Sequence, residues 1–273
     1  MVAPLAEVFP RPSVVGVVNV TADSFSDGGA FTRPEAAVAY ARGLVDEGAV
    51  LVDVGGESTR PGSSGVSLDE ELRRVIPVLE HLQDLPISVD TSKAEVARRA
   101  LELGVVMVND VTALRGDPDL AGVVAESDAY LCLMHMLGEP RTMQDDPRYD
   151  DVVSEVASFL EERLRFAVEV GIPEERISLD PGIGFGKTVE HNLELIARID
   201  EIVALGRPVM VGASRKRFLG RVLGDPDALT GPLAAGVAVA VLAYERGASL
   251  FRVHDVRQHV EALTAANAVT GAA

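Results

Sequence analysis

Polar side chains that are uncommon in strands follow short apolar segments along the whole chain. Carboxylates and carboxamides can hold a flat, nitrogen-rich heterocycle by its edge, and pterins, purines and pyrimidines all have such an edge. Arginine and lysine, which also occur at these positions, bind phosphate or carboxylate groups. The positions are Asn19, Asp53 with Glu57, Asp90, Asn109, His135, Asp180, Ser214 to Arg217, and Arg252 with His254.

A single Asp or Asn after a strand is often only a helix cap or an Asx turn. Capping accounts poorly for the whole set, because Asp90 is followed by two residues that can themselves cap and Asn109 is paired with a further polar residue, Asp110. The basic run at residues 215–217 would, taken alone, fit a solvated helix start equally well. We therefore expect the set to form one site for a heterocycle that carries phosphate or carboxylate.

The elements that must position these residues alternate regularly. Short β-branched runs are followed by longer amphipathic segments, which is the pattern of βα units and a parallel sheet. The expected helices include residues 35–47, 70–82, 94–103, 152–170 and 193–205. The expected strands are residues 14–20, 50–54, 87–90, 105–109, 130–134, 177–180, 209–211 and 250–253.

Signals at both ends support these helices. A Ser or Thr followed three residues later by Glu predicts a capping box, in which side chains bind the free amides of the first turn. Thr32, Ser67 and Ser92 meet this condition. Glycine just after a helix predicts a left-handed cap. Such glycines are Gly48, Gly104, Gly171, Gly206 and Gly247.

Eight βα units predict an α/β fold, a (β/α)₈ TIM barrel in a single domain. We assign residues 1–273 to one domain, with the barrel proper at about 14–268. An open doubly wound sheet is the alternative, but the glycine-rich first turn of such sheets is absent after the first strand. In a barrel the carboxyl ends of all strands meet at one face, and that face holds the active site.

Composition restricts the class of protein. Hydrophobic residues make up 47% and aromatic residues 4%, so the core must consist of small aliphatic side chains. A formal charge of −17 argues against a nucleic-acid or membrane-surface binder. The single cysteine, Cys132, lies in an apolar run and suits core packing. Because no targeting or spanning segment is evident, we expect a soluble cytoplasmic protein.

Three functional motifs that could be sought in this sequence are incomplete or absent. Residues 182–188 resemble a phosphate loop, but the spacing is one residue short and Pro181 stands where the first glycine is needed. The histidines show no H-E-x-x-H pattern and no cysteine partners, which argues against zinc, and we expect His81, His191 and His259 on helix surfaces. No G-x-S-x-G elbow is present, which argues against a hydrolase nucleophile.

Two polar, glycine-rich loops, at residues 21–29 and 55–62, are also unusual. Each carries a residue, Phe25 or Pro61, that can lay an apolar surface on a ring. Such loops can close over a substrate, or they can be ordinary surface turns.

With these residues in place, the sequence closely resembles the dihydropteroate synthase family, from about residue 14 to the last helix near residue 260. The matching segments follow the family's order and fall at the strand ends marked above. They include GVVNVTADSFSDGG (16–29), DVGGESTRPG (53–62), DPGIGFGK (180–187) and GASRKRF (212–218), with shorter matches at 88–91, 108–111, 134–136 and 252–256.

The resemblance implies a transferase of folate biosynthesis. Such an enzyme condenses 6-hydroxymethyl-7,8-dihydropterin diphosphate with 4-aminobenzoate and yields 7,8-dihydropteroate and diphosphate. Diphosphate leaves the exocyclic CH₂ first or nearly so, and the arylamine attacks the resulting cation. The resemblance also implies Mg²⁺ as cofactor and a homodimer through the C-terminal helices, which suits the nearly all-apolar segment 232–244.

The resemblance further implies a role for each matched side chain. The residues expected to bind the pterin are Asp90, Asn109, Asp180 and Lys216. Those expected to bind diphosphate are Asn19, which would also hold Mg²⁺, Arg252 and His254. The 4-aminobenzoate pocket would comprise Phe25, Thr59, Arg60, Pro61 and Arg217. The expected catalytic set is Asn19, Asp27, Lys216, Arg252 and His254.

Rival functions remain open at this point. A pterin-dependent methyltransferase would lack the intact STRPG and SRKRF segments, both of which are present. A non-catalytic pterin-binding paralogue would bind the pterin diphosphate but release no diphosphate when 4-aminobenzoate is added. A phosphate-binding barrel isomerase is disfavoured by carboxylates that suit a heterocycle.

Overall fold

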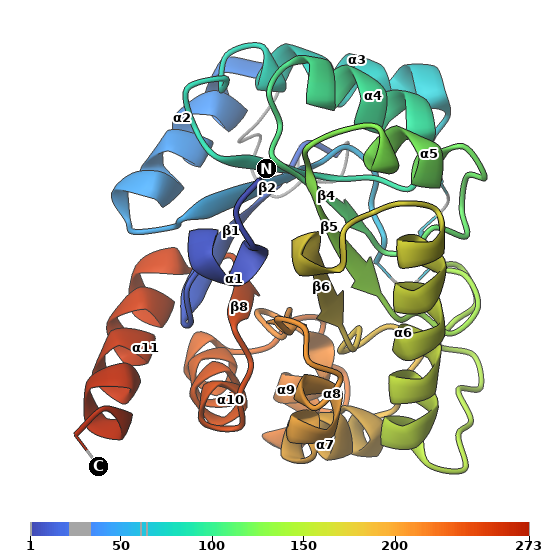
Figure 1. Ribbon diagram of the computed structural model, residues 1–273. Coiled ribbons are helices and arrows are strands. Elements are labelled where there is room, and N and C mark those ends of the chain that lie inside the picture. Colours follow the sequence, from blue (N-terminus) through green and yellow to red (C-terminus); the bar gives the residue numbers. More distant parts are fainter. Residues whose placement is uncertain (1, 22–33, 61, 64, 273) are drawn as a thin grey trace.

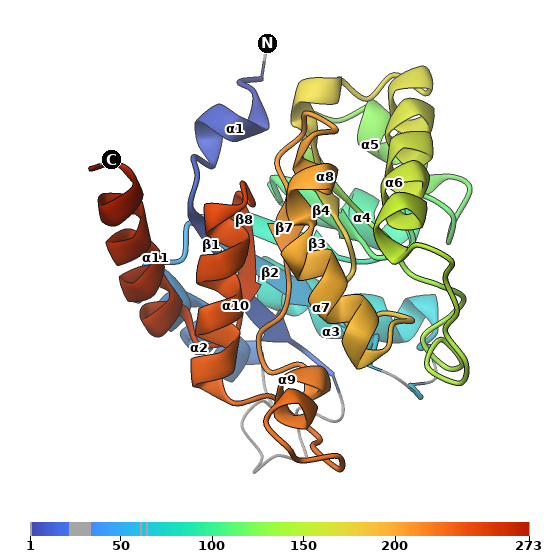
Figure 2. The ribbon, with the colours of Figure 1, turned by 90° about the horizontal axis from the view of Figure 1, so that it is seen from below.

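The computed structural model describes residues 2–21, 34–60, 62–63 and 65–272. Within these residues, eight parallel strands stand at the centre and helices surround them (Figures 1 and 2). Every strand overlaps a range predicted from the sequence. The strands are β1 (Ser13–Asn19), β2 (Leu51–Gly55), β3 (Ile87–Asp90), β4 (Met107–Asp110), β5 (Tyr130–Met134), β6 (Ile177–Asp180), β7 (Met210–Val211) and β8 (Leu250–Val253).

The strands form one sheet that curves into a barrel, in the order β6-β5-β4-β3-β2-β1-β8-β7. β1 pairs with both β2 and β8, which joins the beginning of the chain to its end. The remaining seam lies between β6 and β7, where Leu179 pairs with Val209 and the Leu179 amide donates to the Pro208 carbonyl at 2.9 Å. The predicted single-domain TIM barrel is confirmed, and the open sheet is excluded.

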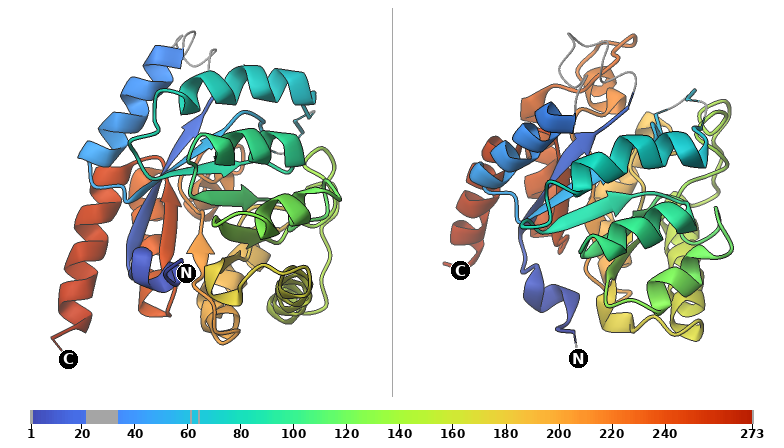
Figure 3. Two further views of the ribbon diagram at one scale, coloured as in Figure 1. Left: turned by 45° about the horizontal axis from the view of Figure 1, so that its top comes forward. Right: turned by 90° about the horizontal axis from the view of Figure 1, so that it is seen from above.

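Helices cover the outside of this barrel, and α11 lies beside the end of α2 (Figure 3), where the Arg257 amide donates to Glu47 Oε2 at 3.3 Å. The predicted helix at 193–205 is divided in two, because the backbone leaves the helical region at Arg198. The helices are α1 (Leu5–Val8), α2 (Pro34–Asp46), α3 (Leu68–Leu79), α4 (Ala94–Glu102), α5 (Leu120–Ala125), α6 (Val152–Glu169), α7 (Val189–Ala197), α8 (Ile199–Val203), α9 (Arg217–Val222), α10 (Leu233–Glu245) and α11 (Val256–Thr270), with a 3₁₀ turn η2 (Glu174–Arg176).

The described helices are all too short or too polar to cross a membrane. Their glycine caps are as predicted. The five glycines expected after helices all have positive φ, from 80° to 105°, which is the left-handed region where a side chain would be strained.

Two of the predicted N-terminal caps can be compared with the structure, and one of them is wrong. Ser67 accepts from the Glu70 amide at 3.3 Å, as predicted, but the Glu70 carboxylate accepts from Arg74 Nε at 2.8 Å instead of completing the capping box. Ser92 does not cap α4. The Ala94 amide donates instead to Asp117 Oδ2 at 2.9 Å, and a carboxylate from a distant loop is the stronger acceptor for a helix N-terminus. The third predicted cap, Thr32, lies outside the described residues.

The core inside the barrel is apolar at one end and polar at the other. At the amino-terminal ends of the strands, α1 covers a cluster that includes the predicted core cysteine, Cys132, while α9 lies at the opposite end (Figure 2). Polar side chains inside the barrel are therefore concentrated toward the carboxyl ends. The apolar cluster comprises Leu5, Phe9, Val15, Leu51, Met107, Tyr130, Cys132, Met210 and Leu250.

His259 is buried, with 1% of its surface exposed, so its predicted place on a helix surface is wrong. Its Nδ1 lies 2.7 Å from the Asp255 carbonyl oxygen, and α10 packs against α11. Periodicity alone gave no sign that a second helix covers this face.

The distant cap of α4 gives a first prediction. Asp117→Ala should lower the free energy of unfolding by about 1 kcal/mol, because the Ala94 amide loses its acceptor. Ser92→Ala should change it by less than about 0.5 kcal/mol, since this hydroxyl caps nothing. Urea unfolding followed by circular dichroism measures both. An equal decrease in the free energy of unfolding in the two variants would show that Asp117 contributes no more than Ser92 to capping α4.

Candidate active site

Polar side chains meet in one narrow cavity at the carboxyl ends of the barrel. They come from the ends of β3, β4, β6 and β8 and from the segments after β2 and β7. Residues far apart in the sequence are thus brought together, as predicted. The lining comprises Thr59, Asp90, Asn109, Val111, Met134, Asp180, Gly182, Ile183, Phe185, Gly212, Lys216 and Arg252.

The Arg252 guanidinium links two acids of this region. Its Nε donates to Asp53 Oδ2 at 2.6 Å, and its Nη2 donates to Asp90 Oδ2 at 2.9 Å. Asn109 Nδ2 donates to the same Asp53 oxygen at 3.0 Å. Four side chains, one each from β2, β3, β4 and β8, are therefore linked by hydrogen bonds. Three of them, Asp90, Asn109 and Arg252, line the cavity.

Burial decides the charge state of the site. Desolvation raises the pKa of Asp90 to about 7, against the opposing effect of Arg252. It also raises the pKa of Asp180. Burial lowers the pKa of Lys216 to about 7, although Asp180 favours its charged form. Acidic and basic groups in one pocket thus have pKa values that are shifted toward neutral pH, which is characteristic of functional sites.

The segment after β6 is held from both sides. Asp180 Oδ1 accepts from the Gly182 amide at 2.7 Å. Gly182 has φ 67°, and a Cβ there would overlap the His135 carbonyl oxygen, so only glycine fits. Lys216 Nζ donates to the Ile183 carbonyl at 2.8 Å and lies 4.0 Å from the centre of the Phe185 ring. Phe185 therefore lines the cavity with one face of its ring against the Lys216 ammonium.

Behind this segment lies a buried pair that the sequence did not reveal. Lys187 Nζ is 2.9 Å from His135 Nδ1 and donates to the Phe185 carbonyl at 3.0 Å. Burial lowers the pKa of Lys187 to about 7 and that of His135 to about 2. His135 is thus a neutral acceptor for the lysine. The two residues support the pocket from outside and do not line it.

His254 and Asn19 lie near the cavity without lining it. Ser214 Oγ accepts from the His254 amide at 3.2 Å and lies 3.3 Å from His254 Nδ1. Burial lowers the pKa of His254 to about 3, and Arg252 adds to the effect. If the Ser214 hydroxyl donates to Nδ1, the remaining proton sits on Nε2, so a neutral His254 can donate to an anion. Asn19 ends β1 and is partly exposed.

The basic cluster at residues 215–217 is not one anion site. Arg215 is exposed and pairs with Asp255 at 2.7 Å, Lys216 faces the cavity, and Arg217 is the first residue of α9. α9 begins at Arg217, so the basic run does stand at a helix start, but only its last residue belongs to the helix. A turn with φ 57° at Arg215 separates the three side chains.

The predicted 4-aminobenzoate residues are placed only in part. Thr59 lines the cavity, while Arg60 is exposed and Arg217 is half-buried outside the lining. Phe25, Asp27 and Pro61 lie outside the described residues. Nearby, Glu57 forms an ion pair with Lys93, which also binds Glu71, so Glu57 supports this segment from the side of α3.

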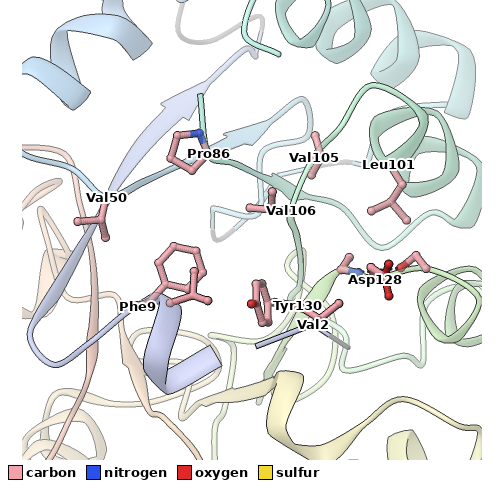
Figure 4. A pocket seen from close by; sticks show the side chains of 12 residues that line it. Val2, Phe9, Val50, Pro86, Leu101, Val105, Val106, Asp128 and Tyr130 are labelled. Carbon is pink, nitrogen blue, oxygen red and sulfur yellow. Dashed lines mark hydrogen bonds between the residues drawn. The ribbon is translucent and has the colours of Figure 1, made fainter. Parts of the chain in front are cut away.

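A larger cavity of about 630 Å³ lies at the opposite end of the barrel (Figure 4). Its walls are almost entirely apolar, with Phe9, Pro86 and Tyr130 facing it (Figure 4), and no set of titratable groups converges on it. Convergent polar groups with shifted pKa values mark a site better than volume does. We therefore place the candidate site at the carboxyl ends.

The chain matches the family of pterin binding enzymes over residues 15–254. It is 45% identical over 267 residues to dihydropteroate synthase of Escherichia coli K12, covering 96% of this chain and 93% of that protein. A structure of Xanthomonas albilineans dihydropteroate synthase with 4-aminobenzoic acid has a TM-score of 0.87 and 49% identity, and covers 96% of this chain and 94% of that one. Another, in complex with 7,8-dihydropteroate, has a TM-score of 0.82 and 44% identity over the same shares of the chains. This protein is a member of the dihydropteroate synthase family of pterin binding enzymes.

Proposed function

We propose that this protein is a transferase that joins 6-hydroxymethyl-7,8-dihydropterin diphosphate to 4-aminobenzoate, with release of diphosphate. The observation that carries the proposal is the cavity in which Asp90, Asn109, Asp180 and Lys216 converge. Relatives with this function match nearly the whole chain, and one solved relative holds the product 7,8-dihydropteroate. The methyltransferase alternative has no comparable support.

The pterin edge is proposed to bind the four converging side chains. Carboxylates accept from the ring's N–H groups, and the Lys216 ammonium donates to its carbonyl oxygen. The Phe185 ring offers a flat apolar face beside them. A ligand that lacked these donors would leave buried carboxylates without partners, which is the basis of strong selectivity.

Diphosphate is proposed to leave toward Asn19, Arg252 and His254. Arg252 remains protonated because Asp53 and Asp90 oppose the effect of burial and raise its pKa. His254 is neutral and can donate one hydrogen bond from Nε2. Donors fixed in advance at the leaving oxygen stabilise the charge that develops there. Once the C–O bond to diphosphate has broken, the electron-poor pterin faces the two carboxylates. The arylamine nitrogen then forms the C–N bond to the CH₂ group and loses its extra proton to solvent or to the released diphosphate.

We also propose Mg²⁺ as a cofactor at Asn19. No group of three His, Cys, Asp or Glu side chains within the described ranges could hold a metal by itself. Mg²⁺ suits such a site, because it keeps several waters and is bound by few protein oxygens together with substrate phosphates. The partly exposed Asn19 carboxamide provides one such oxygen. When bound, Mg²⁺ would neutralise charge on the diphosphate.

4-Aminobenzoate is proposed to bind beside Thr59, with Phe25, Arg60, Pro61 and Arg217 completing its pocket. Of the three that the structure describes, Thr59, Arg60 and Arg217, only Thr59 lines the cavity. Asp27 belongs to the loop at residues 21–29, and we propose that it helps this loop to complete the site. Exclusion of water matters for this reaction, because water would capture the cation in place of the arylamine.

We propose a homodimer through the C-terminal helices. α10 has apolar side chains on every face, and Leu233 and Leu242 are exposed on it, at 37% and 44%. A helix that is apolar all round is normally buried on all sides, which one barrel does not provide.

A coupled assay of diphosphate release with both substrates tests the function. Lys216→Ala and Asp180→Ala should each lower kcat/KM by about a hundredfold or more, because each leaves a buried partner unpaired. Arg215→Ala is the matched control, since Arg215 is exposed and pairs with Asp255, and it should lose less than about threefold. Tight pterin binding without diphosphate release in the wild type would instead identify a non-catalytic paralogue.

The neutral pKa values predict a bell-shaped dependence of kcat/KM on pH. The Lys216 ammonium, with a pKa of about 7, is lost as the pH rises, and the Asp90 carboxylate, also near 7, is lost as it falls. In Lys216→Arg, whatever its rate, the fall between neutral pH and about pH 9 should disappear, because a guanidinium stays protonated. If kcat/KM of Lys216→Arg fell at high pH as it does in the wild type, deprotonation of Lys216 would not be the cause of that fall.

The metal proposal predicts that a chelator abolishes turnover and that added Mg²⁺ restores it. Asn19→Ala should raise the Mg²⁺ concentration for half-maximal activity by about tenfold, since one oxygen ligand is lost. Asn19→Asp, which keeps the oxygen, serves as the control and should raise it less. The same Mg²⁺ requirement in Asn19→Ala as in the wild type would contradict the assignment.

A further inference from the structure

Asp53 lies beneath the candidate site, and the role given to it above is limited to keeping Arg252 protonated. Its side chain is 1% exposed on β2 and does not line the cavity. Its Oδ2 nevertheless accepts from two residues that do, Asn109 at 3.0 Å and Arg252 at 2.6 Å. One buried carboxylate thus joins β4 and β8 directly under the pocket.

The chemistry of Asp53 determines which end of the Asn109 carboxamide faces the ligand. A carboxylate can only accept hydrogen bonds, whereas a carboxamide has NH₂ at one end and a carbonyl oxygen at the other. Asn109 must therefore turn its NH₂ group to Asp53. Its oxygen is left for the cavity, as an acceptor.

Asn109 depends on Asp53 more than Arg252 does. Arg252 has a second anchor, because its Nη2 donates to Asp90 at 2.9 Å. For the Asn109 side chain, Asp53 is the single hydrogen-bond partner within the described part of the chain. Loss of the Asp53 charge would leave Arg252 anchored but would free the Asn109 amide to rotate.

We propose that Asp53 is a positioning residue that makes the pocket selective for heterocycles with a hydrogen-bond donor opposite Asn109. The inference rests on the proposed function and deepens it, since it states which edge of the pterin this wall accepts. A ligand with an acceptor at that place would face an oxygen that cannot turn away, and two buried acceptors in contact are unfavourable.

Exchange of the two side chains tests the proposal. Asn109→Asp places a second carboxylate where the amide now lies 3.0 Å from Asp53, and like charges at this distance repel. In the double variant Asp53→Asn/Asn109→Asp, the new Asn donates to the new Asp, and an oxygen still faces the cavity. The atom of residue 53 that donates can no longer accept from Arg252, which keeps its bond to Asp90, so the recovery is expected to be partial. KM for the pterin diphosphate should rise about a hundredfold in Asn109→Asp and recover at least about tenfold in the double variant.

Ser88→Ala combined with Asn109→Asp is the matched control. Ser88 is paired with Asp53 in the strand register and is equally buried, and within the described ranges its hydroxyl has no partner. This control should recover nothing, because the two carboxylates remain in contact. An exchange variant no better than Asn109→Asp, or an equal recovery with Ser88→Ala, would overturn the proposal.

Asp53→Asn alone provides a measurement if Asn109→Asp does not fold. This change keeps the shape of the side chain, and calorimetry should show pterin diphosphate binding weakened about tenfold. In the assay kcat should fall less than KM rises, whereas a general loss of structure would lower both activity and melting temperature. Binding equal to the wild type overturns the inference alone. A wild type that binds no pterin diphosphate overturns the proposed function, and the inference with it.

Discussion

The Arg252 guanidinium, held between the carboxylates of Asp53 and Asp90, is the interaction on which the candidate site depends. A buried charge is costly unless it is paired and hydrogen-bonded, and a buried acid is costly for the same reason. The ion group meets both requirements at once, because each charge is the partner of another. It also fixes distances between β2, β3 and β8, which are not all neighbours in the sheet. The pocket is therefore shaped by charges that lie partly below it.

The same constraint sets the division of the barrel interior. Side chains toward the amino-terminal ends are apolar and are covered by α1, so that half of the interior contributes stability without chemistry. The charged groups of the candidate site lie in the other half, where a ligand and solvent can reach them. The apolar cavity of about 630 Å³ near α1 is larger than the polar one, yet it offers nothing that would orient a heterocycle or stabilise a leaving group. Chemistry and volume thus identify different ends of the barrel.

Rigidity of the site comes from the backbone after β6 as much as from its side chains. Gly182, Gly184 and Gly186 all have positive φ, from 64° to 83°, and the carboxylate of Asp180 accepts from the Gly182 amide within this segment. Lys187 and His135 support it from behind, and Lys216 contacts it from the side of the cavity. Such preorganised supports are what a site needs in order to bind a developing charge without rearrangement. The neutral state of His135, caused mainly by its burial, keeps the lysine amine directed into this region.

The sequence by itself determined the eight strands, the barrel and the side chains gathered at its rim. These features depend on the spacing of apolar residues, on glycines at the ends of helices and on the type of residue that ends each strand. Asp90, Asn109, Asp180, Lys216 and Arg252 were identified in this way. It could not show that Arg215 turns away to Asp255, that Asp117 caps α4 from 23 residues away, or that His259 is covered by a neighbouring helix. It placed Asp53 in the polar set at the strand ends but could not show that this acid lies beneath the cavity and binds Asn109 and Arg252. Partners across a barrel are contributed by strands distant in the chain, so pairing, burial and the resulting pKa values were decided only when the sheet closed.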